Sequence, residues 1–108
     1  MCCGLPTKGD LKALSKFVTF PAYQSALEGA LHGKVHMAVG GNMAGPSSPS
    51  DPLFWLHHAN IDRLWAAWQS KHAGQDPPNS TEVLKPKPIF GVKVSAMLKI
   101  ATLGYSYA

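Results

Sequence analysis

Cysteine is scarce, because the 108-residue chain has only two, adjacent at Cys2 and Cys3. Neighbouring cysteines pair with each other only under strain, so a disulfide framework and a zinc site of spaced cysteine pairs are both excluded. Long apolar runs are also missing. No segment approaches the roughly 20 residues of a membrane span, so we predict no transmembrane helix. The N-terminus shows no apolar leader, and we therefore expect a cytoplasmic location with free thiols.

Charged residues are few, at 15% of the chain. Ten Lys and Arg against six Asp and Glu give a formal net charge of +4. The lysines are scattered and form no dense patch interleaved with aromatic residues, so we predict no nucleic-acid partner. The hydrophobic share of 45% is typical of a globular protein and excludes a disordered chain. At this length we expect one domain over residues 1–108.

Apolar spacing predicts a mainly α-helical fold. The predicted elements are helices over 10–20, 22–37 and 51–72 and a loop over 39–50. Asp10 is the expected N-cap of the first helix. Three glycines and two prolines predict the loop. Asp51 is a good N-cap for the third helix, and Pro52 suits its first turn because the missing N–H costs nothing there.

The C-terminal segment, 75–108, differs from the rest of the chain in its residue pattern. Four prolines break it into extended pieces, so we expect an irregular, Pro-rich segment. Residues 83–84 and 89–92 are candidates for short strands. The pattern over 93–103 fits either a short helix or a strand.

Four of the five histidines lie between residues 32 and 68, as do all three tryptophans. His32 and His36 are four residues apart, so on a helix both imidazoles share one face. The third predicted helix carries an apolar stripe: Phe54, Ile61, Trp65 and Trp68. His58 falls on this stripe and is expected to point inward, whereas His57 falls on the flank of the helix. The tryptophans are expected to be core residues.

Two helices joined by a loop tend to pack antiparallel, which would bring His32, His36 and His58 to one point. Three neutral imidazoles suit copper, zinc, iron or nickel. No carboxylate lies on the same predicted inward faces, which argues against a facial-triad iron site. The alternative is that each histidine is an ordinary hydrogen-bonded core residue.

The chain resembles the second copper-binding region of tyrosinases. The resemblance rests on three stretches: HGKVH over 32–36, GGNM over 40–43, and the serine-proline approach to DPLFWLHHANIDRLW over 51–65. The 22-residue spacing from His36 to His58 is similar to that of bacterial tyrosinases, and the closing GYSY over 104–107 looks like the tyrosine motif that ends their catalytic domain. The resemblance is strong over 26–70, extends toward residue 108, and is weak over 1–20.

This resemblance implies a type-3 copper protein. Such proteins hold two coppers, three histidines each, in a four-helix bundle, and use O2 to hydroxylate phenols or to oxidise catechols to quinones. His32, His36 and His58 match the ligands of the second copper and would be the catalytic centre. The other matches are a non-ligand neighbour at His57, a packing ring at Phe54, helix-anchoring polar residues at Asp62 and Arg63, and a position near the site mouth at Ser47.

Two departures from the family pattern shape the expected activity. Gly33 stands where tyrosinases that hydroxylate monophenols often carry Asn, which with an upstream Glu is thought to orient a deprotonating water. Glu28 is the candidate for that Glu. Without the Asn, diphenol oxidation is favoured over monophenol hydroxylation. Five histidines also cannot supply two sites of three, so the first copper site is missing.

Three functions follow as hypotheses. The first is a copper-dependent polyphenol oxidase acting on a phenolic substrate and O2, with the second copper absent or supplied by association, through a homodimer or a separate partner. The second is a non-catalytic copper-binding half-domain. The third is a structural helical module without metal.

Overall fold

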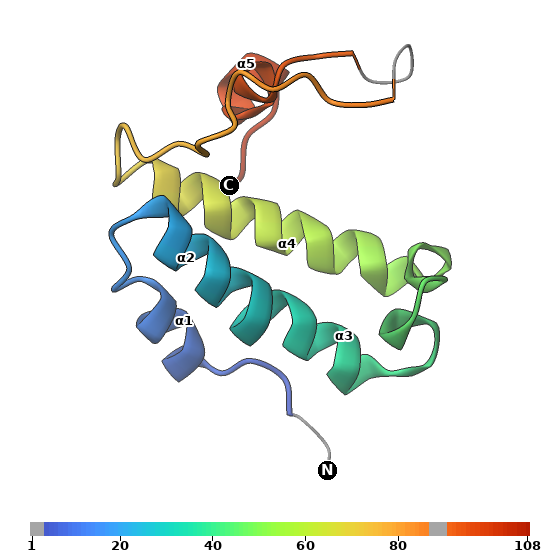
Figure 1. Cartoon of the computed structure of the whole chain (residues 1–108). Coiled ribbons are helices and arrows are strands. Elements are labelled where there is room, and N and C mark those ends of the chain that lie inside the picture. The colour runs from blue at the N-terminus through green and yellow to red at the C-terminus, as the bar shows by residue number, and fades with distance from the viewer. Residues whose placement is uncertain (1–3, 87–90) are drawn as a thin grey trace.

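A computed structural model describes residues 4–86 and 91–108. The fold is mainly helical, as predicted (Figure 1). Its α-helices are α1 (Lys8–Leu14), α2 (Phe20–Ala26), α3 (Lys34–Val39), α4 (Pro52–Gln69) and α5 (Ile100–Leu103). A π-helical segment, η1 (Leu27–Gly33), joins α2 to α3, and three short 3-10 turns are η2 (Gly41–Ala44), η3 (Ser48–Ser50) and η4 (Val94–Met97).

The centre of the fold is an antiparallel helix pair. In Figure 1, α2, η1 and α3 form one nearly continuous rod, and α4 runs beside it in the opposite direction. The short turns η2 and η3 reverse the chain between them. The antiparallel arrangement predicted from the sequence is therefore present, and it faces η1 and α3 toward the first half of α4.

The predicted first helix, 10–20, has the wrong bounds. Thr7, rather than Asp10, is the N-cap: the Thr7 hydroxyl accepts from the Asp10 N–H at 3.2 Å, and the Asp10 carboxylate accepts from the Thr7 N–H at 2.6 Å. This reciprocal capping box fixes the start of α1 at Lys8. The helix ends at Leu14. The next helix, α2, begins at Phe20 and has Pro21 in its first turn.

The two other helices lie close to their predicted ranges. The rod is helical from Phe20 to Val39, longer than the predicted 22–37. For α4, Asp51 is the N-cap as predicted, and its carboxylate accepts from the Leu53 N–H at 2.9 Å. The helix ends at Gln69, before the predicted end at residue 72. The predicted loop, 39–50, contains the two 3-10 turns η2 and η3.

The hydrophobic core lies where α1, the rod and the second half of α4 meet. Its buried residues are Leu14, Tyr23, Leu27, Leu31 and Trp68. The Trp68 indole stacks on the Tyr23 ring with centroids 4.4 Å apart and donates to the Phe17 carbonyl at 2.8 Å. The Tyr23 hydroxyl donates to the Leu64 carbonyl at 2.9 Å, and burial raises the pKa of Tyr23 to about 12.

One predicted core residue is outside the core. Trp55 is 64% exposed, and its indole N–H donates to the Pro49 carbonyl at 3.1 Å. Successive helical residues point about 100° apart, so a residue next to Phe54 on α4 turns away from the stripe that faces the rod. Trp65 is partly buried against the core and Trp68 is buried, as predicted.

The C-terminal segment crosses α4 and is tied to it by two tyrosines. The hydroxyls of Tyr105 and Tyr107 donate to the same Asp62 oxygen at 2.7 and 2.6 Å, and this acceptor raises the pKa of Tyr107 to about 12. Upstream, short strands were expected over 83–84 and 89–92. The described residues contain one antiparallel bridge there, between Val83 and Lys93. Residues 87–90 lie outside the described part of the chain. Residues 93–103, whose sequence pattern fitted either a helix or a strand, are helical in part and contain η4 and α5.

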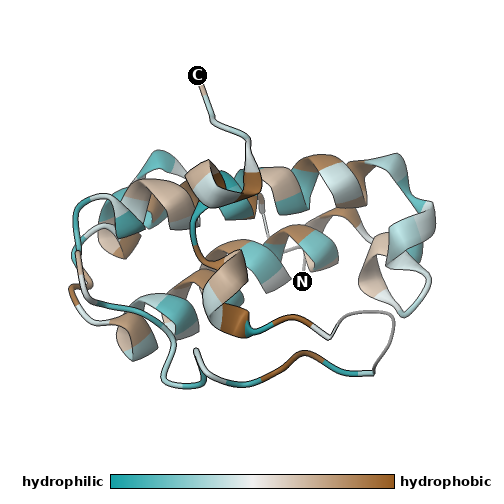
Figure 2. Cartoon of the chain, turned by 90° about the horizontal axis from the view of Figure 1, so that it is seen from above, coloured by the Kyte–Doolittle hydropathy of each residue, from teal (hydrophilic) through white to brown (hydrophobic). Residues whose placement is uncertain are grey.

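Apolar and polar residues are mixed along every helix. Figure 2 shows hydrophobic and hydrophilic residues side by side along the helices of the described chain. Among the described residues no helix is long and apolar enough to cross a membrane.

Candidate metal centre

Three imidazoles meet between the rod and the first half of α4. His32 lies in η1 and His36 in α3, one turn apart, while His58 approaches from α4. The Nε2 atom of His36 lies 3.1 Å from Nε2 of His32 and 3.2 Å from Nε2 of His58. The structure thus brings together the three histidines that the sequence pattern placed on facing helix sides.

Hydrogen bonds at the far side of two rings fix their tautomers. The Nδ1 atom of His36 lies 2.7 Å from the Met43 carbonyl oxygen, which can only accept, so Nδ1 carries the proton. The Nδ1 atom of His32 lies 2.8 Å from a Glu28 carboxylate oxygen and donates to it in the same way. In the neutral rings, both Nε2 atoms therefore present lone pairs to each other.

A cation fits this arrangement. At 3.1 Å, the Nε2 lone pairs of His32 and His36 repel each other. The Nε2–H of His58 can donate to His36, but the contact between His36 and His32 is then still without a proton. Nitrogen ligands at 2.0–2.1 Å around a tetrahedral metal lie about 3.3 Å apart, close to the observed separations. Histidine ligands that donate their other N–H to a carbonyl or a carboxylate are typical of metal sites.

Phe54 packs against the third histidine of the cluster. Its ring stacks on the His58 imidazole with centroids 4.0 Å apart and an interplanar angle of 25°. Both side chains are half-buried, and burial, followed by the charge of His32, lowers the pKa of His58. The His58 imidazole is therefore favoured in its neutral form, which is the form that binds a metal.

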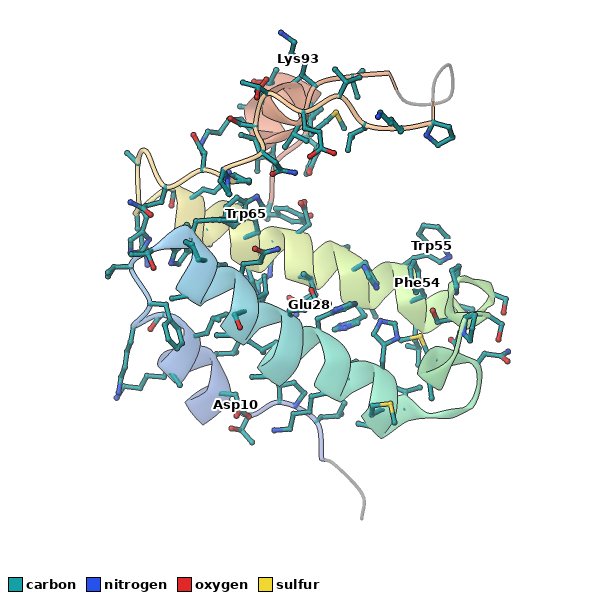
Figure 3. All side chains as sticks on the ribbon, in the orientation of Figure 1. Asp10, Glu28, Phe54, Trp55, Trp65 and Lys93 are labelled. Carbon is teal, nitrogen blue, oxygen red and sulfur yellow. The ribbon has the colours of Figure 1, made fainter. Side chains whose placement is uncertain are left out.

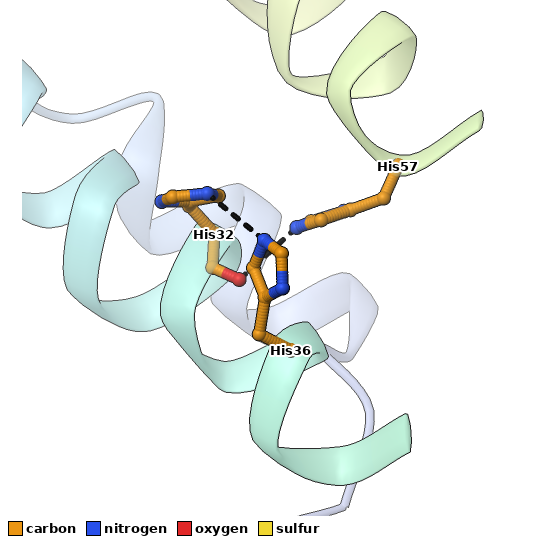
Figure 4. A group of neighbouring side chains, drawn as sticks. All are labelled: His32, His36 and His57. Carbon is orange, nitrogen blue, oxygen red and sulfur yellow. Dashed lines mark hydrogen bonds between the residues drawn. The ribbon is translucent and has the colours of Figure 1, made fainter. Parts of the chain in front are cut away.

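His57 is a rival third ligand. One nitrogen each of His32, His36 and His57 lie within 4.8 Å of one another (Figure 4). The His57 Nε2, however, donates to the His32 carbonyl oxygen at 3.0 Å, so this nitrogen carries the proton and only Nδ1 has a lone pair. A ligand must offer a lone pair. The shorter contacts of the His58 Nε2 therefore favour His58 over His57.

The remaining predicted residues surround the cluster at different depths. Gly33 follows the first histidine in the helical backbone. The Ser47 hydroxyl is exposed and donates to the Asn42 side-chain oxygen at 3.3 Å. Glu28 binds the His32 ring at Nδ1, on the side away from the Nε2 atoms of the cluster. The spacing of four residues from Glu28 to His32 was a usable signal for this contact.

The Met43 carbonyl was missed by sequence reasoning. It holds the His36 ring, and the Met43 side chain is buried at 1% exposure. Only the backbone conformation of η2 brings the carbonyl there, beginning with Gly40 and Gly41 at φ values of 70° and 55°. Such positive angles suit glycine, but the sequence gives no indication of which carbonyl the turn would present.

Comparison with known proteins identifies the family of the chain. The family model for the common central domain of tyrosinase matches residues 7–71. A tyrosinase of Streptomyces glaucescens is 41% identical over 83 residues, which cover 65% of this chain and 30% of the relative. Grixazone synthase of Streptomyces griseus is 42% identical over 65 residues, covering 60% of this chain and 20% of the relative. The chain thus spans less than a third of the length of these relatives, and it belongs to the tyrosinase family of copper oxidoreductases.

Proposed function

We propose that this chain holds one copper ion through His32, His36 and His58 and takes part in the oxidation of catechols to quinones by O2. The single observation that carries the proposal is the meeting of three Nε2 atoms at 3.1 and 3.2 Å with two tautomers fixed for metal binding. Copper would supply the redox centre that passes electrons from the catechol to O2. Two catechols and one O2 would give two quinones and two waters.

The chain's own residues would hold and shape the site. The Met43 carbonyl and the Glu28 carboxylate keep the lone pairs of His36 and His32 directed at one point. The Phe54 ring covers one face of His58. Three imidazoles leave a coordination position open for substrate or O2. Ser47, which the resemblance puts near the mouth of the site, is small and exposed and would not block entry.

The test is quinone formation by the copper-loaded chain in air. The proposal expects catechol-dependent O2 uptake that is lost when copper is removed by a chelator. Copper binding without quinone formation would instead support a non-catalytic copper-binding half-domain. A chain that binds no copper would be a structural helical module, and the proposal would be wrong.

Substrate preference is expected to depend on Gly33. Catechols should be oxidised faster than monophenols, because Gly33 offers no side chain to hold a water that deprotonates a phenol. A Cβ added at Gly33 would lie 3.4 Å from the Glu28 carbonyl, an ordinary contact, and the local φ of −62° is helical. The Gly33→Asn variant should therefore fold and raise the ratio of monophenol to diphenol rates.

Gly33→Ala is the matched control for that experiment. It adds the same Cβ without the amide, so its rate ratio should stay near that of the parent. Equal parent rates on tyrosine and on its ortho-diphenol would contradict this explanation of substrate preference. So would an equal rise in the ratio for the Ala and Asn variants.

We further propose that two copies of the chain associate. On the apolar stripe of α4, Ile61 and Trp65 pack against the core and offer little surface to a second copy. The exposed apolar residues lie elsewhere. Four of them, Leu5, Val39, Leu53 and Leu56, line a groove of about 440 Å³ between α3 and α4 together with Val35, His57 and Asn60. An apolar patch of this kind is typical of an interaction site, and a two-fold dimer presents one patch to itself.

Solution mass and electron paramagnetic resonance of the oxidised protein test this association. A dimer whose copper signal is silent would indicate a coupled pair, one copper from each copy. A dimer with a full Cu(II) signal would keep the association but not the pairing. A monomer with a full-strength signal would contradict both and leave a mononuclear copper protein. A chain that gains mass only with a separate protein carrying the first copper site would favour the heterologous partner.

A further inference from the structure

Glu28 contacts one of the candidate metal ligands. It lies in η1, on the same segment as His32, and its Oε1 atom is 2.8 Å from the His32 Nδ1 (Figure 3 labels Glu28 beside α4). The carboxylate faces the back of the imidazole, while the Nε2 of the same ring faces His36. This oxygen therefore contacts a candidate metal ligand rather than a substrate.

We propose that Glu28 is a positioning residue: its carboxylate holds the His32 Nδ1–H and so directs the Nε2 lone pair into the three-histidine cluster. The inference rests on the proposed copper site. It assigns the role of Glu28 to the orientation and electron donation of one ligand, in place of the orientation of a water beside the substrate.

The two ligands of the rod are held by different acceptors. His36 donates to a neutral backbone carbonyl in a turn, at 2.7 Å, whereas His32 donates to a carboxylate. A carboxylate partner withdraws the ring proton more strongly and makes the opposite nitrogen a better donor to a metal. His32 is thus expected to be the stronger electron donor to a metal of the two, because its outer N–H is held by Glu28.

The surroundings of the pair separate this role from a merely structural one. The Glu28 side chain is 71% exposed and that of His32 is 23% exposed. An exposed ion pair four residues apart on a helix adds little to stability. Loss of Glu28 should therefore leave folding nearly unchanged and act on the tautomer of His32 and on metal affinity. Removing such partners typically costs 10–100-fold in metal affinity.

The first readout uses the metal-free protein. Nitrogen-15 NMR of the histidine rings at pH 8 reports which nitrogen of His32 bears the proton. We expect the Nδ1–H form in the parent, its retention in Glu28→Gln, whose amide oxygen still accepts, and its loss in Glu28→Ala. Glu82→Gln is the matched control, because Glu82 also accepts a side-chain hydrogen bond, from Asn79 at 3.1 Å, outside the cluster. An unchanged His32 tautomer in Glu28→Ala would overturn the proposal.

The second readout is Cu(II) affinity, measured by competition with a chelator. Glu28→Ala is expected to bind Cu(II) about 10–100-fold more weakly than the parent and the Glu82→Gln control, with Glu28→Gln in between. Equal affinities for Glu28→Ala and the parent would overturn the role of Glu28. A parent that binds copper but oxidises no catechol would contradict the proposed oxidase activity while leaving the NMR and affinity results for Glu28 intact.

Discussion

Replacement of His58 by Ala is expected to abolish tight copper binding, whereas His57→Ala should retain most of the metal. His58 contributes the Nε2 that lies 3.2 Å from Nε2 of His36. Removing a residue that binds a metal directly should lower the metal affinity by more than the roughly 100-fold that follows from removing a hydrogen-bond partner of such a residue. His57 instead donates to the His32 carbonyl at 3.0 Å. Losing that donor removes one part-buried side-chain hydrogen bond, which should cost about 0.5–1.5 kcal/mol of stability.

Chelator competition and thermal melting of the two variants measure both effects. Because the changes are the same and the residues are adjacent on α4, each variant is the control for the other. The reverse result, with copper lost from His57→Ala and kept by His58→Ala, would move the third ligand to His57. It would also mean that metal binding breaks the bond from His57 to the His32 carbonyl.

Trp68→Ala should unfold the chain or nearly so, whereas Trp55→Ala should not. Trp68 is 4% exposed, stacks on Tyr23, and donates to the Phe17 carbonyl in the connection between α1 and α2. Truncating a buried Trp costs about 3–5 kcal/mol, a large share of the 5–15 kcal/mol that holds a typical domain. Trp55 is 64% exposed, so its loss should cost less than about 1 kcal/mol.

Urea unfolding of both variants, followed by tryptophan fluorescence and circular dichroism, measures the two free energies. A loss of stability in Trp55→Ala equal to that in Trp68→Ala would mean that Trp55 is covered in solution. The surface formed by α3 and the start of α4 would then be the interface between copies. On dilution to the monomer, Trp55→Ala should again lose less stability than Trp68→Ala.

Much of the fold could be predicted because its signals are local. Asp51 and Pro52 mark the start of α4, because Asp is a good N-cap and Pro fits the first turn of a helix. His32 and His36 are four residues apart, so any helix places their rings on one face. The inward direction of His58 followed from the apolar residues that share its helix face. A local signal was also overlooked: Thr7 and Asp10 form a capping box three residues apart.

The parts that could not be predicted depend on contacts between distant segments. The exposure of Trp55 depends on where η3 meets α4, and the bond from Met43 to His36 depends on the path of η2. Two tyrosines converge on Asp62 from more than 40 residues away. Periodicity gives the face of a helix, but it does not give the partner that covers that face.

X-ray absorption spectroscopy of the chain loaded with one equivalent of copper identifies the atoms around the metal. The expected result is three imidazole nitrogens around each copper in the parent and in His57→Ala, with no copper retained by His58→Ala after dialysis. Copper held by sulfur from Cys2 or Cys3, or no copper retained by the parent after dialysis, would contradict a site built from His32, His36 and His58.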